Sequence, residues 1–192
     1  KKIAIKACNP KYAAAITKQN FNSLFITLLG YTFNLNSNYI CIKIVRMENL
    51  LNSSDIPQEP HPQPFECRNL DVKFLKKFIA NTAQERKQPI IIFGANWCPD
   101  ARLLEAVIQL PSVQNFLNPK CNILNVDVGD YEINTELLKY FDPEIETGIP
   151  RVFILDVNGQ ALNIDSNDKM RTARQQSPQE IFDYFQSFVT GN

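Results

Sequence analysis

The sequence has few cysteines, histidines and glycines, and each shortage excludes a class of protein. The 192 residues include five cysteines, one histidine and six glycines. Five cysteines are too few for a disulfide scaffold, and an odd number leaves at least one thiol free in any pairing scheme. There is no C-x2-C pair and no Cys/His cluster, so we expect no metal site of the zinc type. No glycine-rich loop follows an expected strand, and the sequence therefore indicates neither phosphate chemistry nor a cofactor.

Long hydrophobic runs are missing as well. The apolar runs at 21–33 and 39–45 fall short of the roughly 18 residues that a membrane-spanning helix needs. The basic stretch before them is typical of a signal or transit sequence, although no small-residue cleavage site follows Phe33. Two further interpretations of residues 1–46 are a non-native leader before a translation start at Met47, and a folded element. A start at Met47 predicts a cytoplasmic protein, whereas a signal or anchor predicts a periplasmic or membrane-anchored one.

Acidic residues are absent from the first 46 positions. This stretch carries seven Lys or Arg, so the rest of the chain holds 13 basic and 20 acidic side chains although the net charge is zero. The basic residues lack the interleaved aromatics and the fold motifs of nucleic-acid readers. We therefore expect no nucleic-acid partner, and a membrane contact only if residues 1–46 are a true anchor.

Composition divides the chain into three parts. Residues 1–46 form the basic extension, and residues 47–66 form a linker or arm whose closely spaced prolines lack the amide donors of helix and sheet. His61 lies among these prolines, and we expect it to be solvated rather than a ligand or a base. Residues 67–192 form the folded domain, and an overall hydrophobic content of 44% is ample for its core.

Hydrophobic periodicity predicts an α/β sandwich in this domain. Helical spacing occurs at 70–84, 98–110, 136–141 and 178–189, the last preceded by a capping box at 177–180. Strand-like runs occur at 90–93, 123–128 and 152–155, and the first of them suits a central strand covered on both faces. Asn158-Gly159 predicts a hairpin turn into a further strand at 161–164. This order implies a central mixed sheet flanked by helices.

The candidate chemistry lies around Cys98, between an expected strand and an expected helix. Unpaired N–H groups and the helix dipole at that point stabilise a thiolate, which is the nucleophilic form of cysteine. Pro99 suits the first helical turn, and Trp97 offers an apolar platform to a partner chain. Asp100 acts against the thiolate through its negative charge. For Cys98 taken alone, the plainer interpretation is a small buried hydrophobic residue.

The segment Trp97-Cys98-Pro99-Asp100 resembles the W-C-P-D-C form of the thioredoxin superfamily signature W-C-x-x-C. Gly148-Ile149-Pro150 resembles the family's G-I-P, whose proline is cis and lies beside the reactive cysteine. Residues 126–130 and 155–160 are similar to further strand and turn segments of bacterial thioredoxin-like proteins. The resemblance covers about residues 68–190. It implies a thioredoxin-like sandwich with an N-terminal extension.

Three departures from the family pattern bear on the chemistry. Ala101 stands where the family has its second cysteine, Ile92 stands where ordinary thioredoxins have a buried carboxylate, and the link at 142–147 is longer than usual. Alanine cannot release a mixed disulfide as a resolving thiol does. Neither Cys67 nor Cys121 has a helical offset that would replace that thiol, and we expect Cys121 to be a packing residue. An engineered change and a native loss both explain Ala101.

The resemblance implies a thiol-disulfide oxidoreductase in which Cys98 attacks protein disulfides and a thiol reductant or reductase recycles it. With Ala101 in place, we expect trapped mixed disulfides. Trp97 and Pro99 would belong to the substrate-contact surface, and the backbone of Ile149, exposed by a cis Pro150, would pair with an extended substrate. Two alternatives are a non-catalytic binding module on the same fold and a glutathione-dependent monothiol protein.

Overall fold

The structure, a computed structural model, describes residues 25–28, 31–36, 39–44, 49–144 and 146–190. The chain divides into two compact units, residues 1–48 and residues 49–192. In the first unit the strands β1 (Phe25–Leu28), β2 (Tyr31–Asn36) and β3 (Tyr39–Ile44) form an antiparallel sheet in sequence order. The sequence did not predict these strands. The signal, transit, anchor and leader interpretations of residues 1–46 remain predictions, and 1–24, 29–30, 37–38 and 45–46 of that stretch lie outside the described residues.

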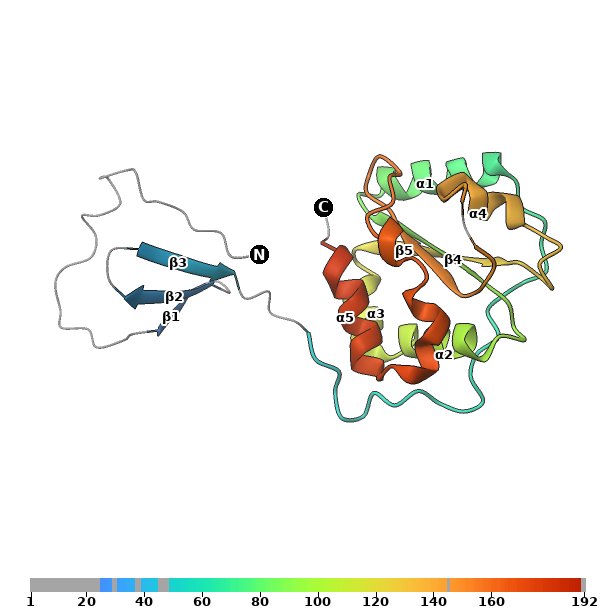
Figure 1. The fold of residues 1–192 in the computed structure, drawn as a ribbon. Helices are drawn as coiled ribbons and strands as arrows, with labels where there is room; N and C mark the ends of the chain where they lie inside the picture. Colours follow the sequence, from blue (N-terminus) through green and yellow to red (C-terminus); the bar gives the residue numbers. More distant parts are fainter. Residues whose placement is uncertain (1–24, 29–30, 37–38, 45–48, 145, 191–192) are drawn as a thin grey trace. The chain divides into compact units, whose positions relative to one another are not determined.

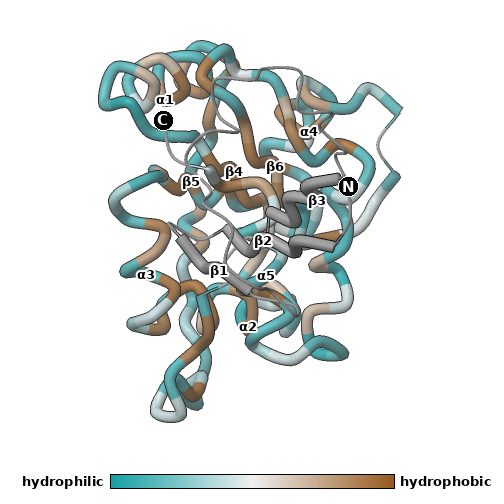
Figure 2. The backbone as a smooth tube through the Cα atoms, turned by 90° about the vertical axis from the view of Figure 1, so that its left-hand side faces the viewer, coloured by the Kyte–Doolittle hydropathy of each residue, from teal (hydrophilic) through white to brown (hydrophobic). Residues whose placement is uncertain are grey.

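The second unit is built on a mixed three-stranded sheet. Strand β4 (Gln88–Gly94) lies in the middle, parallel to β5 (Cys121–Asp127) and antiparallel to β6 (Arg151–Ile154). All seven residues of β4 are buried, which confirms the prediction of a central strand covered on both faces. In Figure 2 the apolar colouring follows β4 and β6 through the middle of this unit. The sheet therefore forms the centre of the hydrophobic core of this unit.

Helices cover both faces of this sheet (Figure 1). On one face lie α1 (Val72–Gln84) and α4 (Thr135–Phe141), and on the other lie α2 (Pro99–Ile108), α3 (Pro111–Leu117) and α5 (Pro178–Phe188). The Ser177 hydroxyl accepts from the Glu180 amide and the Glu180 carboxylate accepts from the Ser177 amide, so the predicted capping box begins α5. The predicted α/β sandwich, a mixed sheet flanked by helices, is confirmed.

The predicted hairpin strand at 161–164 is wrong. Its only ladder contact in the described part of the chain is an isolated bridge between Leu155 and Ala161. The Asn163 side chain replaces a longer strand: its amide oxygen accepts from Ile154 N–H at 2.8 Å and its amide nitrogen donates to the Val152 carbonyl at 2.7 Å. The Val152 N–H donates to the Asn167 carbonyl and the Ile154 carbonyl accepts from Leu162 N–H, so Asn163 satisfies two of the outward-facing backbone groups of β6. The backbone turns instead into the 3-10 helices η2 (Ile164–Ser166) and η3 (Lys169–Gln175).

The helix predicted over 98–110 is observed as α2, which ends at Ile108, and a second helix that the sequence did not predict, α3, begins at Pro111. Proline lacks the N–H that would continue the first helix, and it suits the first position of the second. The break leaves α2 as a ten-residue helix that starts directly after Cys98.

The segment before α1 is extended, without regular structure, and is held to the domain at several points. Phe65 is buried, its amide donates to the Asn96 side chain, and the Asn96 amide donates back to the Phe65 carbonyl. Arg102 in α2 donates to the carbonyls of His61 and Pro62. Residues 61–65 therefore lie against the loop and the helix that flank Cys98.

Among the described residues, no helix is long and apolar enough to span a bilayer.

Candidate functional site

Cys98 occupies the position between β4 and α2 at which the first turn of the helix begins. It is the N-cap residue of α2, with Pro99 at the first helical position, as the sequence predicts. Its backbone amide donates to the Ala95 carbonyl at 3.0 Å, so the loop that leaves β4 is a tight turn. The residue is only 5% exposed, and its side chain makes no capping hydrogen bond to the helix.

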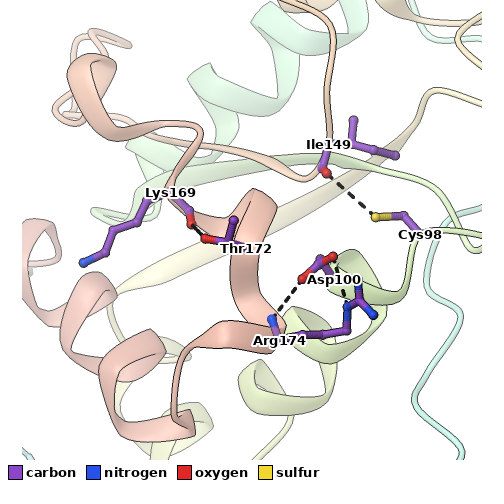
Figure 3. A network of polar contacts seen from close by, with 6 residues as sticks. All are labelled: Cys98, Asp100, Ile149, Lys169, Thr172 and Arg174. Atoms are coloured by element: carbon purple, nitrogen blue, oxygen red, sulfur yellow. Dashed lines mark hydrogen bonds and ion pairs between the residues drawn. The ribbon is translucent and has the colours of Figure 1, made fainter.

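The Cys98 thiol instead faces the loop before β6. Its Sγ lies 3.7 Å from the carbonyl oxygen of Ile149, close enough for the S–H to donate (Figure 3). The bond between Ile149 and Pro150 is cis, as the resemblance implies, and both residues are buried. The two motifs, about fifty residues apart in the sequence, therefore meet at the sulfur atom.

Trp97 and Pro99 are exposed on either side of Cys98 in the chain. The Trp97 side chain is 53% exposed although its indole N–H donates to the Gly129 carbonyl at 2.8 Å. Its ring also contacts the Tyr131 ring edge-on, with centroids 5.9 Å apart. The indole is thus a fixed apolar surface beside the thiol, since both its nitrogen and its ring are held by the 129–131 turn.

Tyr131 belongs to the site, although no sequence motif indicates it. It follows β5 in a turn and has a left-handed backbone, with φ of 70°. Burial raises the pKa of the Tyr131 phenol, and a negative charge on Cys98 raises that pKa further. A hydrogen bond from the Ile149 main chain acts in the opposite direction on the same pKa. The phenol therefore lies beside both the thiol and the peptide group that precedes the cis proline.

The positions around Cys98 offer no second thiol among the described residues. Ala101 is 1% exposed, one helical turn after Cys98, and Ile92 is equally buried in β4. The described cysteines are all free: Cys67 is exposed in the extended segment, and Cys121 is buried at the start of β5. Burial raises the pKa of Cys121 to about 12, which agrees with its predicted packing role. Any chemistry at this site starts from one thiol.

Asp100 is held by an opposite charge that the sequence did not suggest. Its carboxylate accepts from the Arg174 backbone amide at 2.9 Å and from Arg174 Nε at 3.2 Å (Figure 3). The Asp100 side chain is 12% exposed, whereas that of Arg174 is 60% exposed. The expected effect of Asp100 on the thiolate is therefore opposed by the paired guanidinium, and the carboxylate ties α2 to η3.

Two other arginines support the loop before the cis proline. Arg151 is buried and donates to the carbonyls of Gly148 and Glu146 and to the Asn167 side chain, at 2.8–3.0 Å. Arg171 of η3 lies against Gly148, because a Cβ added to that glycine would be 2.5 Å from the Arg171 Cζ. Neither arginine was identified from the sequence, since both lie outside the two motifs.

Within the described ranges, no three His, Cys, Asp or Glu residues gather closely enough to hold a metal ion.

Comparison with known proteins identifies the fold of the chain. No protein-family model matches the chain, and no curated protein sequence does either. Among solved structures, the disulphide isomerase from Xylella fastidiosa Temecula1 matches with a TM-score of 0.59 and 26% sequence identity, over 66% of this chain and 96% of that one. The chain therefore has a thioredoxin-like α/β fold.

Two more distant structures complete the comparison. They are a protein of unknown function from Pseudomonas aeruginosa, with 14% identity, and an HIV epitope-scaffold, with 16%. Each has a TM-score of 0.36 and covers 57% of this chain, with 70% and 73% of the other chain covered. Similarity this low carries no argument about the site.

Proposed function

We propose that the chain is a thiol-disulfide oxidoreductase of thioredoxin type that works through Cys98 alone. The observation that carries the proposal is the position of the Cys98 sulfur, at the start of α2 and 3.7 Å from the carbonyl before the cis proline. The first turn of a helix offers N–H groups and a positive dipole end to a thiolate. The fold, shared with a protein named as a disulphide isomerase, supports the same chemistry.

The reaction is an exchange between a thiol and a disulfide. The Cys98 thiolate attacks one sulfur of a partner's disulfide, a bond forms between the two sulfurs, and the partner's other sulfur leaves as a thiolate. Cys98 is thereby oxidised to a mixed disulfide while the leaving sulfur is reduced. Since Ala101 has no thiol, release of the partner requires a second, external thiol. We propose protein disulfides as the substrates and a thiol reductant or reductase as the recycling partner.

The surface around the sulfur suits an extended polypeptide. Trp97 and Pro99 are exposed beside the thiol, and the peptide groups of Ile149 lie directly across from it. In our proposal a substrate segment adds to the Ile149 backbone as a short strand, and the indole covers its cysteine side chain.

Restoring the missing cysteine tests this function. With Ala101→Cys, we expect dithiol-driven reduction of a protein disulfide such as those of insulin to rise at least about ten-fold, because the second thiol resolves the mixed disulfide. The matched control is Ala101→Ser, which adds a similar atom without a thiol and should give no gain. A second control, Ala101→Cys combined with Cys98→Ser, should also be inactive. A folded Ala101→Cys variant with no gain would count against the proposal.

A binding module without catalysis is the second candidate, and the buried alanine at position 101 favours it. In that case Trp97, Pro99 and the Ile149 backbone would still contact a partner, but Cys98 would be dispensable. Partner capture by the wild type and by a Cys98→Ser variant, both without added reductant, distinguishes the two. Equal capture favours the binding module, whereas capture that requires Cys98 and reverses with dithiothreitol favours the oxidoreductase.

A further inference from the structure

The loop before the cis proline rests on two guanidinium groups that form no ion pair with an acidic residue in the described ranges. All three acceptors of Arg151 are neutral: the carbonyls of Gly148 and Glu146 and the amide oxygen of Asn167. Asp142, Glu146 and Asp168 are near enough to influence Arg151, but in the described part of the chain none forms an ion pair with it. Arg151 is therefore a buried cation that serves to shape the loop.

Arg171 is placed differently, because its guanidinium lies against the face of Gly148. A side chain at that glycine would overlap the guanidinium, so the absence of a Cβ lets Arg171 approach the loop backbone. Arg171 is half-buried, and among the described residues its side chain has no hydrogen bond and no ion pair. The five N–H donors of this guanidinium thus lie beside the loop before Pro150 with no acceptor among the described residues.

The charge of Arg171 reaches the reactive centre. It acts on the Tyr131 phenol, which in turn lies beside Cys98 and hydrogen-bonds the Ile149 main chain. Arg171 and Arg151 are also close enough to disfavour one another's charge, since burial and then Arg171 lower the pKa of Arg151. Their mutual repulsion would be relieved by an anion at the unpaired guanidinium.

We propose that Arg171 is a specificity-determining residue that binds a carboxylate next to the reactive sulfur of the substrate disulfide. This inference rests on the proposed function of Cys98. A planar guanidinium accepts a carboxylate through two parallel N–H···O bonds, which fixes orientation as well as charge. Gly148 is two residues before Pro150, so a segment paired with the Ile149 backbone would bring its neighbouring side chain to Arg171. The substrates are disulfides with an adjacent acidic group.

Two matched peptides test the proposal. They are identical except for Glu or Gln beside a single cysteine, which is activated as a mixed disulfide with 2-thiopyridine. The Cys98 thiolate attacks the peptide sulfur, the two become a disulfide, and pyridine-2-thione leaves with the electron pair. Its absorbance gives the rate. We expect the Glu peptide to react about five-fold faster than the Gln peptide at low salt. A rate ratio of this size corresponds to the contribution of one partly exposed ion pair, here between Arg171 and the peptide carboxylate. The preference should shrink as salt is added.

Variants assign this preference to one residue. Arg171→Gln should reduce the Glu-to-Gln rate ratio to about one. The control is Arg86→Gln, which removes the same charge from an exposed position just before β4, at the opposite end of that strand from Cys98. It should keep the wild-type ratio. A wild-type ratio near one, or a ratio that survives Arg171→Gln, would overturn the proposal while leaving the function of Cys98 intact.

Failure of the underlying function would look different. If Cys98 reacts with neither peptide, so that no mixed disulfide is found at Cys98, the oxidoreductase itself is contradicted. The mixed disulfide of glutathione with 2-thiopyridine, which bears carboxylates and has the same leaving group as the peptides, distinguishes the source of the acidic group. Arg171-dependent reaction with this compound at the rate of the Glu peptide identifies the small disulfide as a substrate, and preference for the peptide identifies an acidic polypeptide. Both results support the role of Arg171.

Discussion

At the scale of single residues, the two peptide groups of Ile149 are already occupied within the chain. Its carbonyl faces the Cys98 thiol at 3.7 Å, and its main chain hydrogen-bonds the Tyr131 phenol. These are the groups that a substrate strand would use under our proposal. Under that proposal, Tyr131 would compete with the substrate for the Ile149 backbone and would have to give way when a partner docks.

Replacing Tyr131 should accelerate the reaction of Cys98 with a disulfide peptide. We propose Tyr131→Asn, because asparagine tolerates the left-handed backbone at this position while removing the ring and its hydroxyl. With the Ile149 backbone freed, we expect the second-order rate of mixed-disulfide formation to rise several-fold, by an amount on the order of one lost hydrogen bond. Stopped-flow release of pyridine-2-thione measures it.

The control for this experiment is Tyr140→Asn, an exposed tyrosine of α4. It should leave the rate unchanged. A Tyr131→Asn protein that folds and reacts more slowly than the wild type would show that the phenol assists the reaction rather than competing with the substrate.

Sequence motifs identify only some of the single residues that form the site. Cys98, Pro99 and Pro150 were found because each belongs to a short motif with a recognisable residue order. Tyr131 and Arg171 belong to no motif, and each reaches the site through a tertiary contact with the loop before Pro150. Such contacts depend on how a turn and a 3-10 helix pack, and local residue patterns do not encode that.

At the scale of elements, Asp100 joins the first turn of α2 to η3. The Arg174 backbone amide loses its acceptor in Asp100→Ala, so we expect the free energy of unfolding to fall by about 1–2 kcal/mol. Arg174→Ala keeps that backbone bond and removes only an ion pair whose guanidinium is 60% exposed, so its cost should be below about 1 kcal/mol. Urea unfolding of both variants measures the difference. Equal costs would show that the ion pair, rather than the backbone bond, joins the elements.

The last residue of β4 is the second element-scale test, because Gly94 is in contact with the Phe65 ring. A Cβ at Gly94 would lie 2.7 Å from Cε1 of that buried ring, so Gly94→Ala must displace Phe65. We expect a loss of about 1–3 kcal/mol in the free energy of unfolding. Phe65→Leu in the same background should recover part of it, a coupling that a double-mutant cycle measures. Additive effects would contradict the contact.

Helices and strands could be predicted where a short sequence pattern specifies them without tertiary contacts. The continuous apolar run of β4 and the capping box of α5 each specify their structure within a few residues. The strand expected at 161–164 is absent because the Asn163 side chain and the Asn167 carbonyl take β6 edge groups that a paired strand would use. A turn signal at 158–159 predicts the reversal of the chain but says nothing about how many ladder bonds follow it. Residues brought to the β6 edge by the tertiary fold form those hydrogen bonds in place of a paired strand.

At the scale of the whole molecule, two buried groups predict that stability falls in alkali. Burial raises the pKa of Tyr184 from 10.0 to about 12 and that of Cys121 from 9.0 to about 12. Both are therefore neutral in the folded state at a pH at which the unfolded chain releases their protons. Their contribution is complete below about pH 9 and is lost as pH rises toward 12.

Tyr184→Phe isolates one of these contributions. The variant loses hydrogen bonds to Asn163 and Ser166, so at neutral pH we expect it to be about 1 kcal/mol less stable than the wild type. This deficit should shrink between pH 10 and 12, because only the wild type is destabilised by ionisation of that phenol in the unfolded chain. Urea unfolding across this range measures the deficit. A deficit that stays constant with pH would contradict the buried, neutral phenol.

The most direct test of the account is residue-resolved alkylation of the native protein with iodoacetamide at neutral pH, read by mass spectrometry. Two other described thiols serve as references for the alkylation rate of Cys98, which lies at the start of α2. Cys67 is exposed, and Cys121 is buried with a pKa of about 12. We predict that Cys98 is alkylated faster than Cys67 despite its burial, while Cys121 is protected. Alkylation of Cys98 as slow as that of Cys121 would contradict a nucleophilic role for Cys98.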